Sequence, residues 1–302
     1  MKMKRIIVLC IALVLIAGLL AGCTSPQTEN GDPSAGDKGT VKIGYVNWVD
    51  VIALTNLATI VLEDTMGYEV QPILADLAPI YASIASGETD AYLGTWLPLT
   101  HAAQMDRYKD ELENLGLVYE EGVMGLTVPA YMAIDSIEDL VGNEDIVNGE
   151  IVGIDAGAGM MGITEDAIKE YGLNMKLLKG SDVTMTALLD QAIKNNEPIV
   201  VTGWKPHWKF ARYDLKILED SKGIFGGEEK AYNIVRLGLS EDMPEVTEFL
   251  TKMYLTIDQL QEIIYMMESS EEDAKTVVRN WIKENADTVS KWLPEGYTLK
   301  VE

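Results

Sequence analysis

Three tryptophans are the residues in this sequence whose type and position most clearly suggest chemistry. Trp48, Trp96 and Trp204 each stand where a predicted strand ends, after VKIGYVN, AYLGT and PIVVTG, and the chain has six tryptophans in all. An exposed ring at such a place suits a quaternary ammonium ion, which cannot donate an N–H hydrogen bond and whose diffuse charge is attracted to the ring face. Sugars also stack on tryptophan, and a lone ring of this kind commonly covers the hydrophobic core.

A glycine-rich loop follows the predicted strand at 150–155 and opens a helix. Its sequence GAGMMG matches the pattern G-x-G-x-x-G, and Asp182 lies about twenty residues further on, as in a dinucleotide-binding fingerprint. The same arrangement presents free backbone N–H groups and the positive end of a helix dipole to any small anion, a carboxylate included. The loop therefore predicts a dinucleotide site, an anion site or a tight strand-to-helix turn.

The two histidines of the chain differ in what they predict. His101 follows WLPLT and should lie in the first turn of a helix close to Trp96, where it either bonds an anion or caps the helix. His207 and Trp208 in TGWKPHWKF are expected to be packing residues. Two histidines and no free cysteine make a poor zinc ligand set, and G-x-S-x-G is absent. We therefore expect no metal, no cofactor and no catalysis.

The first residues read as a targeting signal. MKMKR is followed by the apolar stretch IIVLCIALVLIAGLLA and then by LAGC at 20–23, which resembles a bacterial lipoprotein box. This predicts a signal peptide at 1–22, lipid on Cys23 and a flexible tether at 23–40, with a plain transmembrane anchor as the alternative. The body is then expected at the extracytoplasmic face of the cell membrane, with neither a disulfide nor a thiol nucleophile.

The formal net charge of −24 excludes some partners. No basic stripe is visible, so nucleic acid and anionic lipid surfaces are poor partners. The acidity favours solubility and says little about the ligand.

From residue 41 onward, strand and helix patterns alternate, which is typical of parallel βαβ units and an α/β fold. Helices are expected at 100–116, and long amphipathic ones at 244–269 and 271–293. We predict lobe 1 at 41–133, lobe 2 at 134–232, and a helical C-terminal part at 233–302 that returns toward lobe 1. The ligand should lie in a cleft between the lobes, at the carboxyl ends of the strands.

Four stretches together resemble the glycine betaine-binding receptors of ABC-type osmoprotectant uptake systems, over about residues 41–295. W-L-P-x-T-H and T-G-W-x-P-H-W are the specific motifs among them. The resemblance implies a two-lobed, type II periplasmic-binding-protein-like fold and a trimethylammonium cage of Trp48, Trp96 and Trp204. It implies that the ligand carboxylate is bound by the backbone amides of Gly159 and Met160 and by His101. The stretches are YVNWVDVIALTNLATIVLEDTMGYEV, LAPIYASIASGETDAYLGTWLPLTH, GIDAGAGMMGITEDAIKEY and TGWKPHWKFARYDLKIL.

The resemblance further implies a monomeric, lipid-anchored receptor that closes around glycine betaine or a related carboxylated quaternary ammonium compound. It would deliver the ligand to an ABC permease and catalyse nothing. Met160, Met161 and Tyr81 depart from the residues expected in the family, which leaves the preference among betaines open. A choline or carnitine receptor of the same architecture is the nearest alternative. An oxidoreductase that uses GAGMMG is a distant one.

Overall fold

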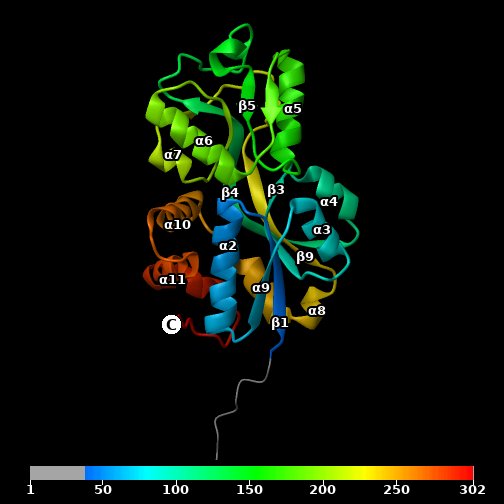
Figure 1. Ribbon diagram of the computed structural model, residues 1–302. Coiled ribbons are helices and arrows are strands. Elements are labelled where there is room, and N and C mark those ends of the chain that lie inside the picture. The colour runs from blue at the N-terminus through cyan, green and yellow to red at the C-terminus, as the bar shows by residue number, and fades with distance from the viewer. Residues whose placement is uncertain (1–37, 302) are drawn as a thin grey trace, which may run out of the picture. The chain divides into compact units, whose positions relative to one another are not determined.

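The computed structural model describes residues 38–301, which are drawn in colour in Figure 1. The predicted signal peptide at 1–22, Cys23 and nearly all of the predicted tether lie outside the described residues. No helix within 38–301 is long and apolar enough to cross a membrane.

A mixed sheet runs through the described residues in the order β2-β1-β3-β9-β4-β7-β5-β6, with β8 paired to β4. β1 is parallel to β2 and β3, and β5 is parallel to β6 and β7, as the alternating pattern predicts. β4 and β9 run antiparallel to their neighbours. The strands are β1 (Thr40–Tyr45), β2 (Glu69–Leu74), β3 (Ala91–Leu97), β4 (Leu112–Pro129), β5 (Glu150–Val152), β6 (Lys176–Leu178), β7 (Val201–Lys205), β8 (Leu215–Ile217) and β9 (Glu229–Arg236).

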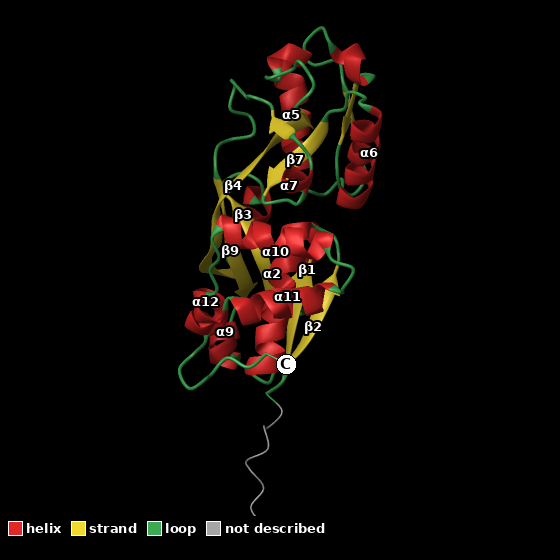
Figure 2. Ribbon diagram, turned by 90° about the vertical axis from the view of Figure 1, so that its left-hand side faces the viewer, coloured by secondary structure: helices red, strands yellow, loops and turns green. Residues whose placement is uncertain are grey.

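Helices cover the sheet and divide it into two lobes (Figure 1). We call lobe 1 the part around β1, β2, β3 and β9, and lobe 2 the part around β5, β6, β7 and β8. Figure 2 shows α2, α10 and α11 together over the strands of lobe 1, and α10 and α11 both pack on α2. The α-helices are α2 (Val49–Ile60), α3 (Leu77–Ala85), α4 (Ala102–Tyr108), α5 (Gly159–Tyr171), α6 (Asp182–Asn195), α7 (Lys209–Arg212), α8 (Leu239–Asp242), α9 (Pro244–Lys252), α10 (Ile257–Ser269), α11 (Ala274–Glu284) and α12 (Ala286–Val289).

Strand β4 joins the two lobes. Its residues 112–122 pair with β9 in lobe 1, and its residues 123–127 pair with β7 in lobe 2. The pairing with β9 is irregular, and Glu121 near the crossing has a positive φ of 68°. The chain returns to lobe 1 at β9. The domain limits at 133 and 232 stay a prediction, since 38–301 form one compact unit.

The helix predicted over 100–116 is wrong in its second half. α4 ends at Tyr108, and β4 begins at Leu112. Gly116 has a φ of 117°, which a helix does not accept, and residues 112–122 gain their hydrogen bonds from β9 instead. Such long-range pairing overrides local helix propensity.

The two long C-terminal helices predicted from the sequence are each broken. Residues 244–269 form α9 and α10, because Thr256 starts a new helix with a capping box. Its side chain accepts from the backbone N–H of Gln259, whose own side chain bonds the backbone N–H of Thr256. Residues 271–293 likewise divide into α11, which Asp273 caps, then α12 and a 3₁₀ turn.

Thr256→Ala should therefore lower the free energy of unfolding by about 1 kcal/mol, because the first turn of α10 loses its cap. Thr256→Ser is the matched control, since it keeps the hydroxyl and should stay near the native value. Urea unfolding of the three proteins measures the difference. Equal stability of the Ala and native proteins would contradict the importance of this cap.

Candidate functional site

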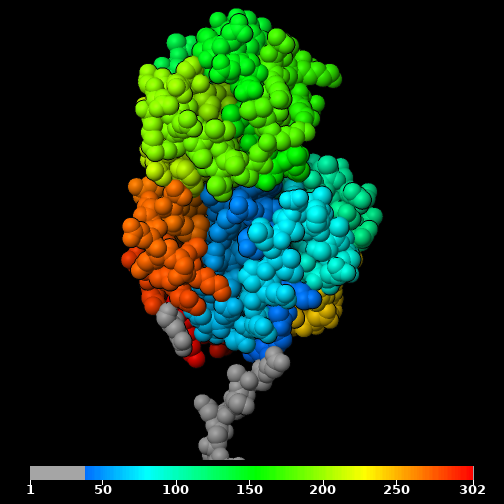
Figure 3. All heavy atoms as spheres, in the orientation of Figure 1, coloured from blue at the N-terminus to red at the C-terminus, as the bar shows by residue number. Residues whose placement is uncertain are grey.

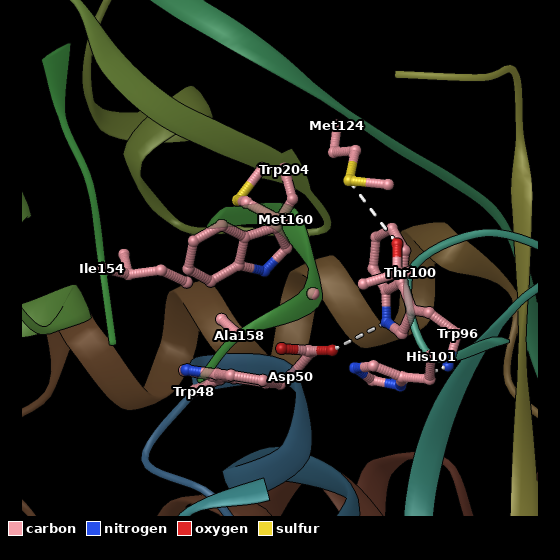
Figure 4. Close-up of a pocket in the computed structure, with 11 residues that line it drawn as sticks. Trp48, Asp50, Trp96, Thr100, His101, Met124, Ile154, Ala158, Met160 and Trp204 are labelled. Carbon is pink, nitrogen blue, oxygen red and sulfur yellow. Dashed lines mark hydrogen bonds between the residues drawn. The ribbon is translucent and has the colours of Figure 1, made fainter. Parts of the chain in front are cut away.

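A small cavity lies between the two lobes, and the empty space in it and at its opening is about 370 Å³. Figure 3 shows the lobes in contact along a seam, and Figure 4 shows the side chains within. The lining residues come from both lobes: Trp48, Asp50, Trp96, Thr100, His101, Met124, Ile154, Ala158, Gly159, Met160 and Trp204. The six ligand-binding residues predicted from the sequence are all among them.

The three tryptophans reach the cavity from three elements. Trp48 precedes α2 with an extended backbone, Trp96 lies in β3 and Trp204 lies in β7. Between 6% and 9% of each residue is exposed, so the rings are covered by protein apart from the cavity side. The Trp48 Nε1–H donates to Asp155 Oδ2 at 3.1 Å, which is a hydrogen bond from lobe 1 to lobe 2.

His101 presents a hydrogen-bond donor to the cavity. The backbone N–H of Trp96 donates to His101 Nδ1 at 2.9 Å, so the ring proton must sit on Nε2. Burial lowers the pKa of His101 to about 3, which keeps the ring neutral at physiological pH. Nε2 has no partner among residues 38–301, although it is buried. The loop before it is held by Glu229, which accepts the backbone N–H groups of Leu99 and Thr100.

The glycine loop places the start of α5 at the cavity. Helix α5 begins at Gly159, and the N–H groups of Gly159 and Met160 find no acceptor in the described part of the chain. Free N–H groups at a helix N-terminus favour an anion. A Cβ added at Gly159 would meet the Thr100 carbonyl oxygen at 1.9 Å. Glycine is thus required at this contact between the lobes.

The three residues that depart from the expected family pattern, Met160, Met161 and Tyr81, differ in whether they reach the cavity. Met160 lines the cavity and contributes to its shape. Met161 points into lobe 2, where its sulfur lies 3.2 Å from the backbone nitrogen of Ile154. Tyr81 is fully buried outside the cavity lining and bonds Thr95 Oγ1 at 2.8 Å.

Asp50 is a cavity residue that the sequence reasoning missed. Its Oδ2 accepts from Trp96 Nε1 at 3.3 Å and from the Tyr119 hydroxyl at 2.9 Å. Its Oδ1 is buried and has no hydrogen-bond partner among the described residues. Burial raises the pKa of Asp50. Its position could have indicated this role, because Asp50 lies two residues after the predicted cavity residue Trp48, in the first turn of a helix.

A buried polar cluster supports Trp204. The Lys209 Nζ lies 4.1 Å from the centre of the Trp204 ring, and it has no hydrogen-bond partner within 38–301. His207 packs edge-on to the same ring at 4.7 Å and bonds Asp182 through Nε2 at 3.0 Å. His207 and Trp208 are both buried, as predicted for packing residues. Burial lowers the pKa of Lys209 to about 7, although Asp182 and Asp50 act in the opposite direction.

The same cluster engages the acidic residue that a dinucleotide site would need for binding ribose. Asp182, the acidic residue of the fingerprint pattern, bonds His207 and is 4% exposed, so its carboxylate is not free to bind a ribose. Among residues 38–301, no group of His, Cys, Asp or Glu side chains has the arrangement of a metal site.

Comparison with known proteins decides the family. Residues 39–284 match the family model described as the substrate binding domain of ABC-type glycine betaine transport system. The chain belongs to this family. Its two-lobed α/β fold is the periplasmic-binding-protein-like fold that the resemblance predicted.

Individual relatives support the assignment. The chain is 41% identical over 179 residues to the glycine betaine/carnitine transport binding protein GbuC of Listeria monocytogenes. This match covers 58% of the chain and 57% of that protein's length. A glycine betaine, L-proline-binding protein (ProX) from Borrelia burgdorferi has a structure with a TM-score of 0.82 and 36% identity, covering 85% of this chain and 97% of that one. Lactococcal OpuAC in its closed conformation with glycine betaine has a TM-score of 0.81 and 34% identity, covering 85% and 100%.

The position of Lys209 predicts how stability depends on pH. Its pKa is about 7 in the folded protein against 10.5 for the ordinary side chain, so between these values the unfolded chain binds more protons. The free energy of unfolding should therefore rise with pH across this window. Below about pH 7 the folded protein bears the full cost of burying a charged Lys209. Lys209→Met should be more stable than the native protein at pH 6, by up to about 5 kcal/mol.

The difference between the two proteins should shrink as the pH rises toward 10. Thermal unfolding of both proteins at pH 6, 8 and 9.5 measures it. A difference that stays constant over this range would show that Lys209 does not carry a lowered pKa.

Proposed function

We propose that the protein is an extracytoplasmic solute receptor that binds glycine betaine, or a related carboxylated quaternary ammonium compound, and delivers it to an ABC permease for osmoprotection. One observation carries this proposal. The same small cavity holds three tryptophan rings and three N–H donors without partners among the described residues, those of His101 Nε2, Gly159 and Met160. Rings attract a methylated cation and N–H groups attract a carboxylate, so the cavity complements a zwitterion.

The cation end would be held by Trp48, Trp96 and Trp204. A cation over such a ring contributes about 0.5–2 kcal/mol, and more in a site that excludes water. The neighbouring Asp50 carboxyl group lines the same cavity. A quaternary ammonium beside it would compensate a buried charge that otherwise has a high cost.

The carboxylate end would be held by neutral donors. A neutral His101 can donate from Nε2 without the cost of burying an imidazolium ion. The N-terminus of α5 adds two backbone donors and the favourable end of its dipole. His101 belongs to lobe 1 and Gly159 to lobe 2, so a ligand bound to both would hold the lobes together.

The closed form would then be the form that the permease recognises. The Trp48–Asp155 hydrogen bond between the lobes supports closure as the liganded state. Lipid on Cys23 as the anchor, a monomeric receptor and the absence of catalysis are parts of the same proposal. Family membership supports transport rather than an enzymatic role.

The variant His101→Ala tests the carboxylate end of the ligand separately from the cationic end. Glycine betaine should bind the variant about 10- to 100-fold more weakly, because a hydrogen bond to the charged carboxylate is lost. Choline has the cation but no carboxylate, and its affinity should change little. Calorimetric titration of the full chain with both compounds measures this. Choline also controls for any disturbance of Trp96, whose backbone N–H bonds His101. Equal losses for both ligands would remove the carboxylate role.

Gly159→Ala tests closure over the ligand. The added Cβ would meet Thr100 O at 1.9 Å, so the lobes cannot close as they do here, and glycine betaine binding should fall by more than about 100-fold. Gly162→Ala is the matched control in the same helix, because a Cβ there meets nothing within 4 Å. It should keep native affinity in the same titration. If Gly159→Ala binds as tightly as Gly162→Ala, the site does not lie between closed lobes.

A further inference from the structure

The Asp50 carboxylate is a group in the cavity that glycine betaine leaves partly unused. Figure 4 shows it among the three tryptophans, with the dashed bond to the Trp96 indole. Oδ2 is occupied by Trp96 and Tyr119, whereas Oδ1 is buried and unpaired within the described part of the chain. The nitrogen of glycine betaine carries four carbon substituents and no hydrogen. It can neutralise the charge of Asp50 but cannot give Oδ1 a hydrogen bond.

Asp50 is held rigidly in this position. Two hydrogen bonds fix Oδ2, and Tyr119 also packs edge-on to the Trp96 ring at 6.2 Å. The carboxylate therefore cannot turn Oδ1 away without losing both bonds. An acceptor that is fixed and unsatisfied favours a donor on the ligand, because a buried acceptor without a partner is costly.

Charge decides which end of the ligand faces Asp50. The carboxylate end of the ligand would be repelled by Asp50, whereas the cationic end would be attracted. The donor that reaches Oδ1 must therefore sit at or next to the methylated nitrogen. Two kinds of ligand offer one: an ammonium that keeps an N–H, or a hydroxyl two carbons away from the nitrogen, as in choline. The site favours the N–H donor, because an N-methylated glycine also carries a carboxylate that can bind His101 and the start of α5.

We propose that the site also takes N-methylated glycines that keep an ammonium N–H, N,N-dimethylglycine above all, with Asp50 Oδ1 as the acceptor. The N–H would form a charge-assisted hydrogen bond, and the two methyl groups would contact the tryptophan rings. This inference rests on the proposed function, because it assumes that the cavity binds a methylated ammonium zwitterion. It makes Asp50 the residue that sets the preference between tertiary and quaternary ammonium ligands.

The test is calorimetric titration of the full chain at pH 7 with glycine betaine, N,N-dimethylglycine and choline. The native protein, Asp50→Asn and Asp50→Ser are compared, and the readout is the ratio of the two zwitterions' dissociation constants. Loss of charge alone weakens both ligands and leaves the ratio unchanged. Loss of the N–H hydrogen bond should weaken dimethylglycine about 10- to 100-fold more than glycine betaine.

Asp155→Asn is the matched control. Asp155 is also a carboxylate that bonds a cavity tryptophan, Trp48, but it does not line the cavity. Its replacement should affect both zwitterions equally and leave the ratio at the native value.

Each outcome separates this inference from the proposed function. If the native protein binds glycine betaine and the ratio is the same in the Asp50 variants, the proposed function stands and the role of Asp50 is overturned. A selective loss of choline in these variants, without loss of dimethylglycine, would assign Oδ1 to a hydroxyl and overturn the N–H proposal. If neither zwitterion binds the native protein, both proposals fail.

Discussion

The close contact between the first turn of α5 and the loop before His101 is the constraint on which the site depends. A single Cβ at Gly159 would collide with the Thr100 carbonyl oxygen. Because no side chain intervenes, the N–H groups of lobe 2 and the histidine of lobe 1 reach the same small cavity. The tryptophans that complete it also come from both lobes. Each lobe presents only part of the rings and part of the donors.

The cavity combines groups that are costly to bury, and the structure compensates for each in a different way. His101 stays neutral and satisfies Nδ1 with a backbone N–H. Asp50 shares one oxygen, Oδ2, between Trp96 and Tyr119. The remaining unpaired atoms, Nε2 of His101 and Oδ1 of Asp50, are the ones a ligand can reach. A ligand with a carboxylate at one end and an ammonium N–H at the other would satisfy both, which explains why polar groups are tolerated in an otherwise aromatic cavity.

Behind the cavity, the positions of the rings depend on a second layer of residues. His207 is clamped between Trp204 and Trp208 and is fixed by Asp182, so the motif T-G-W-K-P-H-W serves mainly to support one ring. The Lys209 Nζ lies near the same ring. This explains why two tryptophans follow one strand so closely: one lines the cavity and the other holds the histidine in place.

The sequence by itself determined the strands and helices of the parallel βαβ units, because alternating apolar patterns and glycine stops are local signals. It also singled out six residues that line the cavity, since ring, histidine and glycine-loop motifs are short. The tertiary structure decided what depends on distant pairing. Residues 112–122 became a strand because β9 lies beside them. Asp50 became a cavity residue because Trp96 and Tyr119, far away in the chain, orient its carboxylate. Hydrogen bonds of this kind leave no periodic trace in the sequence, so only the folded chain reveals them.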